Sequence, residues 1–163
     1  MPSIGLTWDK AKKLFSVPVH LQHRTTPSGE PPKYQGCQTI MYVDTGSSLT
    51  SITDREAAEL LIDVPSLSKE DVAGIGGITK IPIAREIILY FLLADGNPYG
   101  LSLDKVAVQP EEISRVREKN RGIYKQTRSI GGKAVCLLGL DAIEKMNGVL
   151  SIDMRSKSGS VKF

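Results

Sequence analysis

One short motif combines an acidic side chain with a tight turn. Asp44-Thr45-Gly46-Ser47-Ser48 follows directly on the apolar run Ile40–Val43, so the carboxylate is expected where a buried strand ends. A carboxylate held at such a place can act as a general acid or base. An aspartate before Thr-Gly also commonly bonds to its own turn, and these residues alone fit both interpretations.

Two glycine motifs follow in the chain. Ala73-Gly74-Ile75-Gly76-Gly77 lies between runs with strand character and is typical of a hairpin tip, and Val135–Leu138 is an apolar run that leads into Gly139 and a helix. In this order the three motifs resemble those of the retropepsins, the single-domain aspartic proteases of retroviral type: an active-site turn, a flap hairpin and the segment beneath the turn. The resemblance covers residues 14–163, apart from a basic insertion at about 111–133.

The resemblance implies an aspartic endopeptidase whose catalytic residues are Asp44, Thr45 and Gly46. It implies a peptide or protein substrate, no metal and no cofactor. The substrate contacts that it implies are Ser47, Ser48, Ala73, Gly74, Ile75, Gly76, Gly77 and Leu138.

The chain carries a single Asp-Thr-Gly, at Asp44. Without a metal, peptide hydrolysis needs one group that activates water and another that protonates the leaving nitrogen. Two adjacent carboxylates that share one proton do both. The second carboxylate is therefore expected from another copy of the chain in a two-fold homodimer.

Two positions depart from the viral pattern. Ser48 stands where viral enzymes carry an acidic residue, and Leu140 stands where they carry the arginine that pairs with it. Because both partners are replaced, no buried charge is left unpaired. We expect the fold to be retained, and the dimer to use a C-terminal hairpin formed by Val149–Asp153 and Val161–Phe163.

Strand signals dominate the rest of the chain and favour an all-β fold. The resemblance makes this a closed, barrel-like acid-protease domain with a flap hairpin and one or two short helices. Two helices are expected in the domain itself, at Thr53–Leu61, which opens on a Thr53/Glu56 capping box, and at Asp141–Met146. The basic insertion offers a third, at Glu111–Asn120. The expected strands are β-branched or alternating runs at 13–21, 39–43, 81–93 and 101–108.

Length and composition indicate one globular domain, because 163 residues with 40% apolar and 24% charged side chains can bury a single core. No apolar run approaches the roughly 20 residues of a membrane-spanning helix, and the start lacks a secretory leader pattern. We therefore expect a cytoplasmic protein with no membrane contact. Cys37 and Cys136 have no metal or redox spacing, which favours buried or free thiols.

The net charge of +3 is concentrated in the insertion. A solvated face is the commonest origin of such a run, and nucleic-acid contact is the next. By the resemblance this segment lies at the mouth of the active site, where it either covers the cleft or has no role in catalysis. Its basic residues are Arg115, Arg117, Lys119, Arg121, Lys125, Arg128 and Lys133.

Other kinds of site have weaker support. His20 and His23 lack the helical spacing and the glutamate of a zinc protease, the glycine motif at 74–77 lacks the ending of a phosphate loop, and no Gly-x-Ser-x-Gly surrounds Ser47 or Ser48. The alternatives of another class are a retropepsin-fold module that binds peptide without cleaving it and a basic module that binds nucleic acid.

Overall fold

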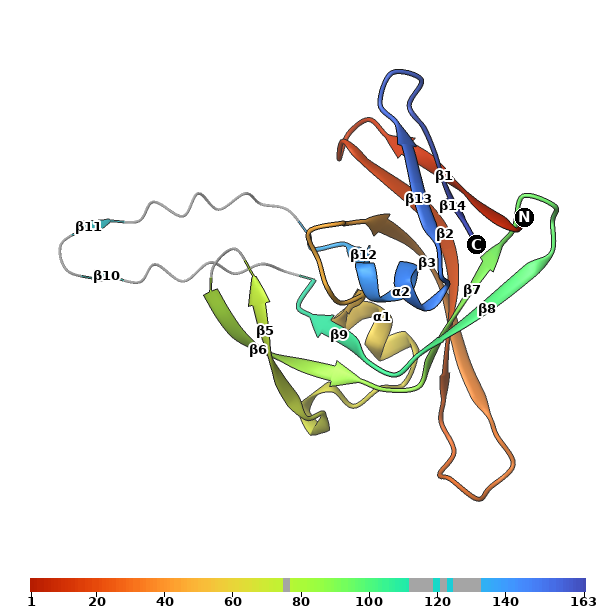
Figure 1. Ribbon diagram of the computed structural model, residues 1–163. Helices are drawn as coiled ribbons and strands as arrows, with labels where there is room; N and C mark the ends of the chain where they lie inside the picture. Colours follow the sequence, from red (N-terminus) through yellow and green to blue (C-terminus); the bar gives the residue numbers. More distant parts are fainter. Residues whose placement is uncertain (75–76, 112–118, 121–122, 125–132) are drawn as a thin grey trace.

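The computed structural model describes residues 1–74, 77–111, 119–120, 123–124 and 133–163 (Figure 1). These residues are mainly β-strand, with two short α-helices. Twelve strands belong to one sheet, and the short strands β10 (Lys119–Asn120) and β11 (Ile123–Tyr124) pair separately with one another.

The sheet runs in the order β13-β14-β1-β2-β3-β12-β4-β9-β6-β5, with β7 paired to β2 and β8 paired to β7. The strands are β1 Ser3–Asp9, β2 Leu14–Arg24, β3 Tyr34–Val43, β4 Ser51–Thr53, β5 Lys69–Gly74, β6 Gly77–Ala84, β7 Ile87–Leu92, β8 Pro98–Leu103, β9 Val106–Gln109, β12 Cys136–Leu138, β13 Val149–Asp153 and β14 Ser158–Lys162.

The expected closure of the sheet into a barrel is wrong, because in the described part of the chain β13 and β5 lie at opposite ends of the strand order and do not pair. The β13–β14 hairpin extends the sheet beyond β1, and the β5–β6 hairpin projects from the other end (Figure 1). The sheet is therefore open, with an exposed edge strand at each end.

The central pair, β2 and β3, pairs from Ser16↔Tyr42 to Arg24↔Tyr34. Val17, Val19 and Leu21 are buried on one face of β2, in the two-residue period of a strand with one face on the core. The strands expected at 13–21 and 39–43 are thus confirmed, and both are longer than their apolar runs.

Two expected strands are each divided in the structure. The run 81–93 gives the end of β6 and all of β7, separated by Arg85-Glu86, where Glu86 has a φ of 56°. The run 101–108 gives parts of β8 and β9, separated by Asp104-Lys105.

Helix α1 spans Asp54–Glu59, a 3-10 turn spans Val64–Ser66, and α2 spans Leu140–Lys145. The capping box of Thr53 and Glu56 is present. These two expected helices are confirmed, but the expected helix at 111–120 is not: residues 112–118 lie outside the described part, and Lys119–Asn120 forms strand β10. Among the described residues, no helix has the length and apolar character needed to cross a membrane.

The core lies between the inner face of the sheet and the apolar sides of the two helices, where Ala57, Leu60 and Ala142 are fully buried. Cys37 and Cys136 are buried free thiols, as expected. Burial raises the pKa of Cys37 to about 11 and that of Cys136 to about 12, so both thiols stay protonated at neutral pH.

Candidate active site

The Asp44 turn lies where two parallel strands end. β3 and β12 pair from Met41↔Cys136 to Val43↔Leu138, so their carboxyl ends meet at one edge of the sheet. The chain leaves β3, turns through residues 44–50 and returns as β4 on the other side of β12 (Figure 1). The turn therefore encloses the end of β12.

Asp44 holds this turn through its backbone and through one carboxylate oxygen. Its N–H donates to the carbonyl of Leu138 at 3.1 Å, and its carbonyl accepts from the Ser47 N–H at 3.1 Å. Its Oδ1 accepts from the Gly46 N–H at 2.9 Å. Within the described residues Oδ2 has no hydrogen-bond partner, so turn capping leaves one oxygen of this half-buried carboxylate for chemistry.

Gly139 packs closely against the backbone of Leu49 and Thr50, at the end of the turn. A Cβ at this position would lie 2.5 Å from the carbonyl carbon of Leu49 and 2.7 Å from the Thr50 nitrogen. The Gly139 N–H donates to Thr50 Oγ1 at 3.1 Å, and the Leu140 N–H donates to the Ser47 carbonyl at 2.9 Å. The glycine thus allows the start of α2 to bond directly to the turn.

Thr50 and Asp141 complete this attachment, and no sequence motif indicated a role for them in the site. The N–H and the Oγ1 of Thr50 both donate to Asp141 Oδ1, each at 2.8 Å. Thr50 is 0% exposed. Because a buried polar group without a partner is costly, this pair fixes the turn to α2.

The other predicted residues of the turn differ in exposure. Thr45, Gly46 and Ser48 are exposed, whereas Ser47 is half-buried and its Oγ donates to the Leu49 carbonyl at 2.7 Å. Leu138 was predicted to contact substrate, but its side chain is 1% exposed and packs in the core. Its contact with the turn is made by its carbonyl.

Leu137 is placed better than Leu138 for contact with a ligand. It lies opposite Tyr42 in the β3–β12 pair and is half-buried. Since side chains alternate along a strand, Tyr42 and Asp44 project from the same side of β3, and Leu137 projects beside them. Leu138 was expected from the resemblance, and strand alternation is the signal that would have identified Leu137.

The glycine-rich motif forms the predicted hairpin. β5 and β6 pair down to Ala73↔Ile78 and Gly74↔Gly77, while Ile75 and Gly76 lie outside the described residues. In the sheet order β12, β4 and β9 separate β3 from β6. The Asp44 turn and the hairpin are thus carried by separate elements of one sheet.

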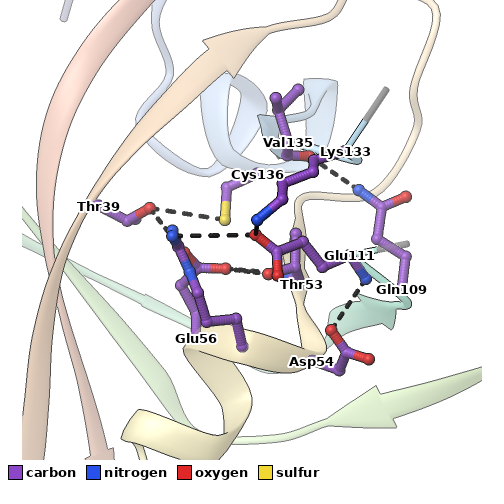
Figure 2. Close-up of polar contacts among 10 residues, drawn as sticks. Thr39, Thr53, Asp54, Glu56, Gln109, Glu111, Lys133, Val135 and Cys136 are labelled. Atoms are coloured by element: carbon purple, nitrogen blue, oxygen red, sulfur yellow. Dashed lines mark hydrogen bonds and ion pairs between the residues drawn. The ribbon is translucent and has the colours of Figure 1, made fainter. Parts of the chain in front are cut away.

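A buried polar cluster lies beside the start of β12 (Figure 2). Its centre is the carboxylate of Glu56, which is 1% exposed. This carboxylate accepts hydrogen bonds from Thr39 Oγ1 at 3.2 Å and from Arg55 Nη2 at 2.5 Å. It also accepts from the hydroxyl and the N–H of Thr53. Burial raises the pKa of Glu56, but the bonds from Thr53 and Arg55 outweigh it and lower the pKa to about 2. The ionised carboxylate therefore joins α1 to β3.

The same cluster holds both ends of the basic segment. Glu111 lies 3.9 Å from Arg55 and 3.5 Å from Lys133, its N–H donates to Asp54 at 2.9 Å, and its carbonyl accepts from the Ala134 N–H at 2.6 Å (Figure 2). Residues 112–118, 121–122 and 125–132 lie outside the described part, so the predicted role of this segment stays a prediction.

The two histidines lie within the sheet and its hydrogen bonds. His20 contacts the side-chain amides of Gln22 and Gln38, and His23 Nδ1 lies 3.2 Å from the Leu60 carbonyl. In the part of the chain that the structure describes, no three His, Cys, Asp or Glu side chains are grouped so that they could hold a metal ion.

Comparison with known proteins finds a likeness of structure. The chain resembles the crystal structure of a retropepsin-like aspartic protease from Rickettsia conorii, with a TM-score of 0.50 and 15% sequence identity over 98% of this chain and 88% of that one. No protein-family model matches the chain, and no curated protein matches it. At this identity the likeness concerns the fold and leaves the activity to be tested.

Proposed function

We propose that the protein is an aspartic endopeptidase that acts as a homodimer, with one Asp44 from each subunit. The observation that carries the proposal is the position of Asp44, whose Oδ1 holds an exposed turn at the ends of two parallel strands. This turn lies in a chain whose fold resembles that of a retropepsin-like aspartic protease. A single Asp-Thr-Gly in the sequence requires a second chain for the second carboxylate.

The chemistry follows from two like charges brought together. Two neighbouring carboxylates share one proton, so one activates a water molecule while the other protonates the scissile amide. The exposed Thr45 is free to contact the partner's turn, and Gly46 offers backbone groups to a peptide. We assign Leu138 to support of the turn and Leu137 to its substrate side.

The β5–β6 hairpin is proposed to cover the bound peptide. Its glycines at 74 and 77 allow backbone to approach a ligand closely. Ser47, Ser48 and the tip of the hairpin are proposed to contact substrate backbone. Extended substrates would be bound mainly through such main-chain hydrogen bonds, so the substrate class is an extended segment of peptide or protein.

The test compares wild-type protein with Asp44→Asn on a proteome-derived peptide library read by mass spectrometry. Wild type is expected to cleave internal peptide bonds, best at acidic pH, because activity falls once both carboxylates ionise. The Asp44→Asn variant should fold but lose at least about a thousandfold in rate. Asp95→Asn, an equal change in the exposed turn between β7 and β8, is the control and should retain full rate.

Three outcomes would overturn the proposal. Cleavage by Asp44→Asn at a rate close to that of wild type would remove Asp44 from the chemistry. Saturable binding of peptides by wild type without any cleavage would instead identify a non-catalytic binding module. Tight, salt-sensitive binding of DNA or RNA without cleavage would favour the nucleic-acid alternative.

A further inference from the structure

The β5–β6 hairpin joins the rest of the sheet along a short base. β6 spans Gly77–Ala84, yet its pairing with β9 is limited to Ile83↔Ala107 and Ala84↔Val106. β5 is the last strand in the sheet order and pairs with β6. The part of the hairpin between Ile83 and its tip therefore extends past the other strands of the sheet, which form the body of the domain.

A mainly apolar cavity of about 460 Å³ lies between the hairpin and the body. β6 contributes Thr79, Ile81 and Pro82 to its wall, and the end of β9 contributes Val108 and Gln109. Along this length the cavity separates the hairpin from the end of β9. The hairpin has room to swing toward β9 without breaking a strand pair.

Three charged side chains meet at the base of the hairpin. Glu70 Oε2 lies 2.7 Å from Lys105 Nζ, and Glu70 Oε1 lies 3.0 Å from Arg85 Nη2. Glu70 belongs to β5, whereas Lys105 belongs to the connection between β8 and β9. The Glu70–Lys105 contact is thus a side-chain connection from the edge strand of the hairpin to the body.

We infer that Glu70 is a positioning residue that sets the angle between the β5–β6 hairpin and the body of the domain. The inference rests on the proposed function, in which this hairpin covers the substrate. All three side chains are partly exposed, and exposed ion pairs are individually weak. Such a pair of contacts restrains the swing of the hairpin without locking it, as a cover that must open and close requires.

The neighbouring pair supplies a matched control. Asp71 lies 3.9 Å from Lys80, and both residues belong to the hairpin itself. Asp71→Asn removes the same charge from the adjacent residue but leaves every contact with the body in place. Glu70→Gln should loosen the hairpin, and Asp71→Asn should not.

The angle can be measured by pulsed electron spin resonance between labels on Ile78→Cys and Ala58→Cys. Ile78 is 75% exposed on β6, and Ala58 is exposed on α1. The native cysteines are buried with raised pKa values, so they should escape labelling. Labelled protein is mixed with excess unlabelled protein so that distances within one subunit dominate.

Glu70→Gln is expected to broaden the distance distribution, Lys105→Gln should reproduce the broadening, and Asp71→Asn should match wild type. Salt at about 1 M should broaden wild type but add little to Glu70→Gln, because it screens the same contacts. In peptide hydrolysis, Glu70→Gln should raise KM about threefold with little change in kcat, as the loss of a weak ion pair predicts.

An unchanged distribution in both Glu70→Gln and Lys105→Gln would overturn the inference, as would equal broadening in Asp71→Asn. A failure of the proposed function would give a different result from a failure of this inference. If wild type cleaves no peptide but Glu70→Gln and Lys105→Gln still broaden the distribution, Glu70 positions the hairpin and the hairpin serves a purpose other than catalysis.

Discussion

Gly139 is the residue at which the site leaves no space for a side chain. A Cβ would lie 2.5 Å from backbone of Leu49, which cannot rotate away as a side chain could. Gly139→Ala is expected to destabilise the protein by about 1–3 kcal/mol, as overpacking does, and to lower activity because the Asp44 turn must shift. Urea unfolding and hydrolysis of a model peptide measure both effects.

Gly5→Ala is the matched control for this change. Gly5 lies in β1, and a Cβ there would meet nothing within 4 Å. The unfolding midpoint of the Gly5→Ala variant should stay close to that of wild type. If Gly139→Ala also unfolds at the wild-type midpoint with full activity, close packing at Gly139 does not hold the turn.

Predictability at the residue scale depended on whether a pattern was local. Asp44 and Gly139 each lie in a short motif of unusual residue types, and both could be located from the sequence. Thr50 and Asp141 are common residue types separated by 91 positions. Their contact exists only because β4 and α2 meet at the end of β12, so no local pattern could indicate it.

Helix α1 depends on Glu56, whose buried carboxylate bonds to Thr39 and Thr53. Its pKa of about 2 lies below the ordinary value of 4.5, so it contributes stability that is fully present above pH 4.5 and is lost as the pH falls toward 2. The contribution is up to about 3 kcal/mol. Glu56→Gln should therefore lower the free energy of unfolding at neutral pH and reduce its loss in acid.

Urea unfolding at about pH 7 and about pH 3 measures this difference. Glu59→Gln is the control, because Glu59 is exposed on the same helix. It should change the free energy of unfolding little at either pH. Equal acid sensitivity in wild type and Glu56→Gln would show that the buried carboxylate does not govern α1.

Prediction of the elements succeeded where a capping signal or an apolar run marked them. Thr53 and Glu56 identified the start of α1, and apolar alternation identified β2. β1 was missed although Ile4 and Leu6 alternate with exposed residues, because its seven residues are stabilised by pairing with β14 at the other end of the chain. Arg85-Glu86 divides an expected strand through a left-handed turn at a non-glycine residue, which carries no sequence signal.

At the scale of the whole molecule the sheet is open, and this leaves β13 as an edge strand. The sequence predicted the C-terminal hairpin correctly but placed it on a closed barrel. Closure requires the first and last strands of the order to pair, and that depends on the three-dimensional path of the whole chain. An exposed edge strand is a natural template for pairing with another chain.

Exposed apolar side chains lie on β13 and its turn, where the proposed dimer would pair. Val149 is 67% exposed and Met154 is 52% exposed, beside the unpaired edge. Two-fold pairing would bury these side chains against the same residues of the other subunit. The proposed function needs such a dimer, because each subunit has a single Asp44.

The proposed dimer predicts that specific activity falls on dilution. The double variant Val149→Lys, Met154→Lys should weaken association by at least tenfold, because the introduced lysines of the two subunits would lie close together and repel one another. Sedimentation velocity across a concentration series gives the monomer–dimer equilibrium, and peptide hydrolysis is measured at the same concentrations. Leu92→Lys, at a side chain 68% exposed on β7, is the control and should leave both unchanged. A monomer with constant specific activity at every concentration would contradict the shared site, because one chain supplies one Asp44.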